Sequence, residues 1–219
     1  MKPLATNPPP LATRHLPPAT VFLLDDEPGM LKALTRLLKA EGFTVQAFTS
    51  AKTFLESYRP ETLGCLVLDV AMPELNGMEL QERLTRSGLL VPIVFLTGHG
   101  DIPMSVQAIK AGAVDFLTKP VKDVDLLRAV RAALQRAAEQ RELISEIALL
   151  RQRYASLTPR ECEVMAHVVA GQLNKQVAAD LGIGEHTIKV HRARVMEKMG
   201  FESLADLVRA AERLELGKK

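Results

Sequence analysis

Acidic, hydroxyl and ammonium side chains stand directly after short apolar runs along this 219-residue chain. In chain order they are Asp25, Asp26 and Glu27, then Asp69, then Thr97, and finally Lys119. Clustered carboxylates repel one another unless a cation is present, and an all-oxygen site that keeps water and phosphate as ligands suits Mg²⁺. A carboxylate beside such a metal can attack a phosphoryl group and form an aspartyl phosphate. The set therefore predicts phosphoryl transfer to an aspartate, provided that these side chains converge.

We expect Asp25 and Asp26 to hold the Mg²⁺ and Asp69 to be the phosphorylated nucleophile. Lys119 would place a positive charge beside the phosphoryl oxygens, and the hydroxyl of Thr97 would donate to one of them. The added phosphate carries about −1.5 to −2 charges, enough to rearrange the surrounding loops. Each of these residues alone is common in solvated turns, so the prediction rests on their occurring together.

Five apolar runs, each followed by an amphipathic helical stretch, must position these residues. The runs are Val21–Leu24, Phe43–Phe48, Cys65–Leu68, Ile93–Leu96 and Val114–Leu117. Alternation of this kind predicts an α/β fold with an open parallel sheet that is buried on both faces. Functional groups of such sheets gather at the carboxyl ends of the strands, which is where the polar residues stand.

Three segments resemble the receiver domains of bacterial two-component systems: Leu23–Glu27, Leu68–Gly77 and Phe116–Pro120. The match covers about residues 20–135 and implies a flavodoxin-like fold of five strand–helix units. The segment Thr97–Met104 narrows the resemblance to the FixJ-type subfamily.

This resemblance implies that a sensor histidine kinase phosphorylates Asp69 and that the backbone carbonyl of Ala71 completes the metal shell. Phe116 stands at the position of the switch aromatic, which turns inward as Thr97 engages the phosphate. A plain core aromatic is the alternative for this residue. A cis Lys119–Pro120 bond is also implied and would aim the lysine into the pocket.

The rate of dephosphorylation is expected to depend on Ala71 and His99, which stand two residues beyond the nucleophile and the hydroxyl. Both would flank the path of water to the phosphoryl group. We hypothesise that Ala71, which has no polar side-chain atom to orient a water molecule, gives a long-lived phosphoryl state.

A second group of helices is predicted from Leu157 onward. Thr158–Glu161 has the pattern of a capping box with proline at the first helical position, and Ser203 can cap the last helix. Between them, Gly182–Gly184 is a short turn into the long helix Glu185–Met199. Four helices with a tight turn between the middle pair predict a helix-turn-helix domain.

The long helix should bury Ile188, Val195 and Met199, which leaves its basic residues on other sides. We expect its amino-terminal part to enter the major groove of promoter DNA. The basic residues expected to reach phosphates are Arg192, Arg194 and Lys198.

Residues 157–216 also resemble the LuxR-type DNA-binding domain. The segments that carry the resemblance are Leu157–Glu161, Asn174–Ala178 and Thr187–His191. It implies that the groove is contacted by Lys189, Val190 and His191, and the DNA backbone by Thr187 and Lys175. Two departures matter: Leu173 stands where the family usually has serine, and Gly184 replaces the usual N-capping serine. We expect Asn174 to cap its helix and Leu173 to cost one phosphate contact.

The chain thus divides into a Pro-rich leader expected to be disordered, a receiver domain, a helical linker and a DNA-binding domain. Their predicted bounds are residues 1–19, 20–135, 136–156 and 157–219. The apolar residues of the linker region recur every three or four positions, at Leu143, Ile147, Leu150, Tyr154 and Leu157. This spacing fits either a short coiled coil or a single helix lying on one of the domains.

Composition sets further bounds on function. The sequence is 47% hydrophobic and 25% charged, which excludes disorder throughout. We find no apolar stretch long enough for a bilayer and no signal-peptide pattern, so we expect a cytoplasmic protein without a membrane partner. The net charge says little about nucleic acid, because residues 158–219 hold ten Lys and Arg against nine Asp and Glu.

Together these features predict a transcription regulator, not an enzyme, that binds promoter DNA as a homodimer after phosphorylation of Asp69. The face around residues 102–120 would form the dimer, and two recognition helices would read inverted half-sites. RNA polymerase is an expected partner. One alternative is a hydrolytic enzyme with Asp69 as nucleophile, which would need an acid where Ala71 stands. A second is a phosphorylation-switched regulator that acts by protein contact alone.

Overall fold

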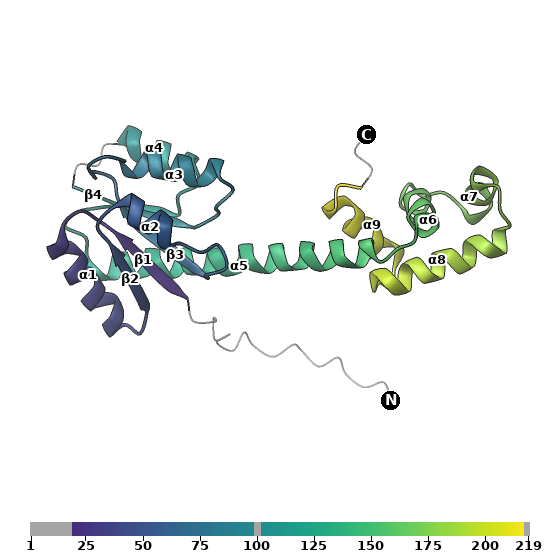
Figure 1. The fold of residues 1–219 in the computed structure, drawn as a ribbon, viewed down its shortest axis with the longest axis horizontal. Coiled ribbons are helices and arrows are strands. Elements are labelled where there is room, and N and C mark those ends of the chain that lie inside the picture. The colour runs from purple at the N-terminus through teal and green to yellow at the C-terminus, as the bar shows by residue number, and fades with distance from the viewer. Residues whose placement is uncertain (1–18, 99–101, 217–219) are drawn as a thin grey trace, which may run out of the picture. The chain divides into compact units, whose positions relative to one another are not determined.

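The computed structural model describes residues 19–98 and 102–216, and the chain divides into two compact units, residues 1–141 and 142–219. The first unit alternates strands and helices (Figure 1). Its elements before the long helix are β1 Thr20–Leu24, α1 Pro28–Ala40, β2 Thr44–Phe48, α2 Ala51–Ser57, β3 Gly64–Asp69, α3 Gly77–Arg86, β4 Ile93–Thr97, α4 Ile102–Lys110 and β5 Asp115–Thr118.

The five described strands form one parallel sheet in the order β2-β1-β3-β4-β5. The central strands β1, β3 and β4 are buried along their whole length, because helices cover both faces of the sheet. On one face α2, α3 and α4 pack through Phe54, Leu80 and Ala108. On the other face, α1 and the long helix pack through Leu38 and Leu126. The predicted flavodoxin-like α/β fold is confirmed.

The long helix α5 runs without interruption over Asp123–Ala155. Asp123 and Asp125 in its first turn stabilise the helix, because their negative charges lie at the positive end of the helix dipole. No Gly or Pro follows within the helix. Up to residue 141 it belongs to the first unit, where Val130 and Leu134 are buried in the core. The predicted continuous linker helix is confirmed.

The carboxyl-terminal turns of α5 belong to the second unit by their contacts. Leu150 and Leu157 are buried there and Tyr154 is half-buried against the same core, whereas Leu143 is exposed. Packing onto one unit therefore accounts for the apolar spacing from Leu150 onward, whereas for Leu143 and Ile147 both the coiled coil and the packed helix stay predictions.

The remaining helices of the second unit are α6 Pro159–Val169, α7 Asn174–Leu181, α8 Glu185–Met199 and α9 Leu204–Arg213. The capping box of Thr158 and Glu161 and the cap at Ser203 are present as predicted. The expected cap at Asn174 is wrong: this residue already lies in α7, and Leu173 is the N-cap. The leucine side chain has no atom that could accept from the first backbone N–H groups of α7. The backbone N–H of Leu173 itself donates to Oε1 of Gln176 at 2.8 Å.

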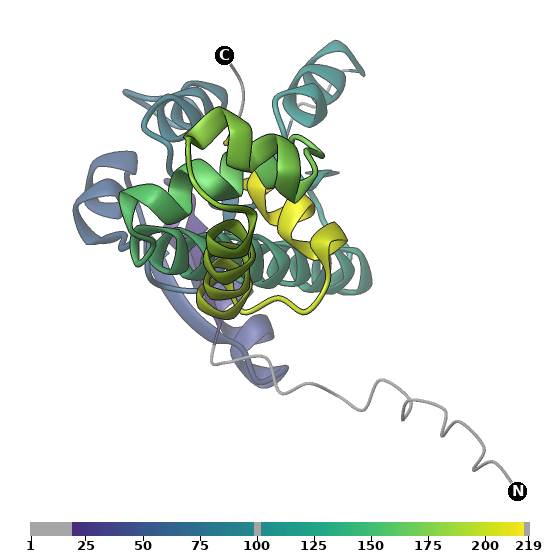
Figure 2. The same cartoon turned by 90° about the vertical axis from the view of Figure 1, so that its right-hand side faces the viewer.

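The predicted core side of α8 is confirmed, since Ile188, Val195 and Met199 are all buried. Figures 1 and 2 show α6 and α7 against one side of α8, with another long side clear of the other helices of this unit. The predicted leader lies almost wholly outside the described residues, as does His99. In the described part of the chain, no helix combines the length and apolarity needed to cross a membrane.

Candidate functional site

Two buried carboxylates and one ammonium group meet at the carboxyl edge of the sheet. Asp25 follows β1 directly and Asp69 is the last residue of β3, and the two are 2% and 4% exposed. Leu24 pairs with Leu68, so the parallel register places Asp25 beside Asp69. The Nζ of Lys119 donates to Oδ2 of Asp25 at 2.7 Å and to Oδ2 of Asp69 at 3.0 Å.

The charge of Lys119 is stabilised by these two carboxylates. Burial by itself lowers the pKa of this ammonium, but the hydrogen bonds and charges of Asp25 and Asp69 outweigh burial and raise the pKa above its usual value. The Lys119–Pro120 peptide bond is cis, as the resemblance implies. The backbone N–H of Lys119 donates to the backbone carbonyl of Thr97 at 2.7 Å, and this bond connects the end of β5 to the end of β4.

The same edge offers a set of oxygen ligands. One carboxylate oxygen from each of Asp25, Asp26 and Asp69 lies within 4.8 Å of the others, and Asp26 is exposed where Asp25 and Asp69 are buried. The other oxygens are partly engaged: Glu27 N–H donates to Asp25 Oδ1 at 2.8 Å, and Ala71 N–H donates to Asp69 Oδ1 at 3.3 Å. Hard oxygen donors open to solvent on one side fit the requirements of Mg²⁺.

The two remaining pocket residues of the prediction lie on neighbouring strands. Thr97 ends β4 and is 2% exposed, one residue beyond Leu96, which pairs with Asp69. Phe116 lies on β5 and is half-buried, with its ring centroid 6.0 Å from that of Phe95. Phe116 is thus partly exposed while it packs against the core on this face of the sheet.

The predicted DNA-contacting residues of α8 fall largely on its uncovered side. The exposed ones are Thr187, Lys189, Val190 and Arg194, together with Lys175 on α7. His191 and Arg192 are half-buried, and the guanidinium of Arg192 donates to Asn174 Oδ1 at 3.3 Å, which connects α8 to the start of α7. Most of the expected residues on these two helices are therefore open to solvent.

Lys198 departs from the expectation. Its Nζ donates to the carboxylate of Glu161 at 2.6 Å and to the carbonyl of Ser156 at 3.2 Å. Glu161 is 3% exposed, so this lysine neutralises a buried charge inside the second unit. We therefore withdraw Lys198 from the predicted phosphate contacts.

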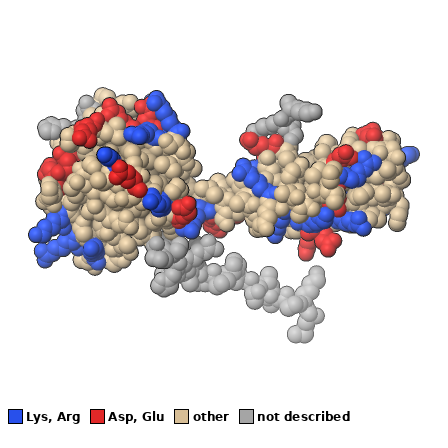
Figure 3. Space-filling model, viewed as in Figure 1, with Lys and Arg blue, Asp and Glu red and all other residues tan. Residues whose placement is uncertain are grey.

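The face shown in Figure 3 carries side chains of both signs, with Lys and Arg lying among Asp and Glu over both units. This agrees with the near balance of charge in residues 158–219.

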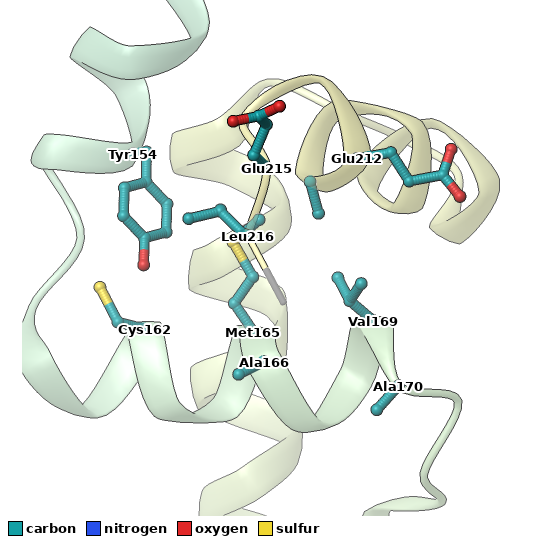
Figure 4. A pocket seen from close by; sticks show the side chains of 10 residues that line it. Tyr154, Cys162, Met165, Ala166, Val169, Ala170, Glu212, Glu215 and Leu216 are labelled. Carbon is teal, nitrogen blue, oxygen red and sulfur yellow. The ribbon is translucent and has the colours of Figure 1, made fainter. Parts of the chain in front are cut away.

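Sequence reasoning missed a cavity of about 540 Å³ in the second unit. Tyr154 and Cys162 stand at one side of it, and Met165, Val169 and Leu216 line its apolar wall (Figure 4). Burial and a hydrogen bond with Cys162 raise the pKa of Tyr154. None of the predicted DNA-contacting residues is among the described residues that line this cavity.

Comparison with known proteins places both units. The sequence model of the response regulator receiver domain matches residues 21–131, and that of the luxR family of bacterial regulatory proteins matches residues 155–211. Response regulator protein TodT of Pseudomonas putida is 47% identical over 197 residues, which cover 90% of this chain and 87% of TodT.

Two further proteins are similar to this chain over most of its length. Transcriptional regulatory protein FixJ of Azorhizobium caulinodans is 42% identical over 191 residues, covering 87% of this chain and 90% of FixJ. The solved structure of response regulator StyR is similar with a TM-score of 0.79 at 48% identity, covering 90% of this chain and all of that one. The chain therefore belongs to the response regulators that join a receiver domain to a LuxR-type DNA-binding domain.

Proposed function

We propose that this chain is a phosphorylation-dependent transcription regulator of a two-component system, in which Asp69 accepts a phosphoryl group from a sensor histidine kinase. The observation that carries the proposal is the bridge from Lys119 to both Asp25 and Asp69 at the carboxyl edge of the sheet. In this function the chain would not act as an enzyme on other substrates. In the division we propose, residues 20–135 form the receiver, 136–156 the linker and 157–219 the DNA-binding domain.

Asp25, Asp26, Asp69 and the carbonyl of Ala71 would hold Mg²⁺, which would neutralise charge on the incoming phosphoryl group. The carboxylate of Asp69 would attack the phosphorus atom and form a P–O bond, while the P–N bond to the phosphohistidine of the kinase breaks and the imidazole leaves. The ammonium of Lys119, already between the two aspartates, would supply positive charge to the phosphoryl oxygens.

Phosphorylation would then shift the population of receiver conformations. The hydroxyl of Thr97 donates to the phosphoryl group, and Phe116 turns inward from its half-buried position. Between these residues, α4 exposes Ile102, Val106 and Ile109, an apolar surface suited to a homodimer formed by the face of residues 102–120.

In the dimer, two α8 helices would read inverted half-sites of promoter DNA. Lys189, Val190 and His191 would contact bases in the major groove. Thr187, Lys175, Arg192 and Arg194 would contact the DNA backbone. Bound at a promoter, the dimer would have RNA polymerase as a partner.

The substitution Asp69→Asn tests the phosphorylation step. Incubated with Mg²⁺ and a small phosphodonor, the parent chain should gain one phosphoryl group by intact mass, and the variant should gain none. Asp123→Asn, at the exposed start of α5, is the matched control and should gain the group like the parent. Phosphorylation of the Asp69 variant at the parental rate would refute the assignment.

A separate experiment tests DNA binding against regulation by protein contact. Duplexes selected from a randomised library by the phosphorylated chain should bind with an affinity that falls with salt, at about −0.9 in log–log slope for each phosphate contacted. Failure to select any duplex would favour the protein-contact alternative.

A further inference from the structure

The end of the linker helix is bonded to the end of the recognition helix. The Nη1 of Arg153, in the last turn of α5, donates to the backbone carbonyl of Met199 at 2.9 Å. Met199 is the last residue of α8, where carbonyl groups lack helical partners and the helix dipole is negative. A guanidinium group, which is positively charged and carries several N–H donors, can donate to such a carbonyl.

The residue after α8 leaves room for this bond. Gly200 has φ +72°, and a Cβ added there would lie 2.6 Å from Nη1 of Arg153. Glycine at this position therefore allows both the left-handed backbone conformation that ends α8 and the close approach of the Arg153 guanidinium.

Two other contacts join the end of α5 and the residue after it to α8 and α9. Lys198, one residue before Met199, donates to the carbonyl of Ser156 directly after α5. About two turns before Arg153, Glu146 of α5 accepts from Arg213 of α9 at 2.8 Å. Residues 142–156 are thus part of the second unit, and a fragment that begins at residue 157 would lack Arg153.

We propose that Arg153 is a positioning residue for DNA recognition, which ties the carboxyl end of α8 to the linker and so sets how α8 lies in the groove. This inference rests on the proposed DNA-binding function. A change in the linker on phosphorylation would reach α8 through this bond, without any contact between Arg153 and DNA.

The test compares Arg153→Ala with Arg151→Ala in the full-length phosphorylated chain. Arg151 is exposed and lies on the same turn of α5, and its replacement by alanine removes the same charge. The probes are a duplex selected by the parent chain and a scrambled duplex of the same composition. We expect Arg153→Ala to bind the selected duplex about tenfold more weakly than Arg151→Ala, because the end of α8 would then have to be ordered on binding, at a cost similar to one charge-assisted hydrogen bond. Both variants should bind the scrambled duplex equally.

Two further readouts separate positioning from general unfolding. Arg153→Lys should restore most of the affinity, because an ammonium can donate to the same carbonyl. Amide exchange in Arg153→Ala should rise at the carboxyl end of α8 and stay parental in α6. Faster exchange throughout the second unit would overturn the inference, as would equal affinity of the two alanine variants for the selected duplex. If the parent selects no duplex, the proposed function fails first and the inference fails with it.

Discussion

The buried ion pair of Glu161 and Lys198 allows a quantitative prediction about the stability of the DNA-binding domain. Replacing Glu161 by glutamine keeps the shape of the side chain and removes its charge. The Lys198 ammonium, 2.6 Å away, and the Thr158 N–H lower the pKa of Glu161 to about 2 from its usual 4.5, against burial, which raises it.

The magnitude follows from this pKa. One unit corresponds to about 1.4 kcal/mol, so the whole shift, from Lys198 and Thr158 together, would contribute about 3 kcal/mol to the free energy of unfolding if fully shielded from solvent. The Lys198 side chain is 34% exposed, and solvent screening reduces our expectation to about 2 kcal/mol. Because the pKa is lowered on folding, this contribution is complete above pH 4.5 and is lost as the pH falls toward 2.

Peptide-resolved amide exchange of α6 and α8 measures this domain within the full chain. At pH 7, Glu161→Gln should exchange about 30-fold faster than the parent, the equivalent of about 2 kcal/mol. At pH 3.5, after correction for intrinsic exchange rates, roughly three-fifths of that difference should be gone.

Glu163→Gln is the matched control, since its partner Arg160 lies at the same 2.6 Å but Glu163 is 51% exposed. It should change the free energy by less than about 0.5 kcal/mol. Parental exchange in Glu161→Gln at pH 7, or a difference that stays constant down to pH 3.5, would refute the reasoning.

Three more predictions concern the phosphoryl site and the recognition helix. Ala71→Asn should speed dephosphorylation of Asp69 severalfold by placing a polar group that orients water, and an unchanged rate of phosphate release would exclude this role. Gly77→Ala would put a Cβ 2.5 Å from the Asp69 carbonyl oxygen. It should destabilise the receiver by about 1 to 3 kcal/mol in urea unfolding and slow phosphoryl uptake, whereas Gly29→Ala, with open space around it, should do neither. Arg194→Ala should make the salt dependence of DNA binding shallower by about 0.9 in log–log slope, and an unchanged slope would remove Arg194 from the phosphate contacts.

The sequence predicted the receiver fold because its signals are local. An apolar run of strand length, followed by an amphipathic helix, repeats five times, and parallel strands bring their carboxyl ends to one edge. The helix starts at Thr158 and Ser203 were equally local, since a cap involves residues three apart. The expected cap at Asn174 was wrong because the chain enters α7 one residue earlier.

The difference between the two adjacent aspartates was beyond sequence reasoning. Asp25 and Asp26 look equivalent in the run Asp25-Asp26-Glu27, yet Asp25 is buried against Lys119 and Asp26 is exposed. Lys119 lies 94 positions from Asp25, and only folding decides which carboxylate it reaches.

By itself, the sequence determined the alternation of elements, the edge of the sheet where chemistry is possible and the core side of α8. These depend on periods of two and 3.6 residues and on short caps, which are written in consecutive positions. Only the tertiary structure decided that Lys198 neutralises Glu161, 37 positions away, and that Arg153 bonds to Met199, 46 positions away. The partner of a long charged side chain depends on which helices pack together and on which charges that packing buries, and neither leaves a local pattern.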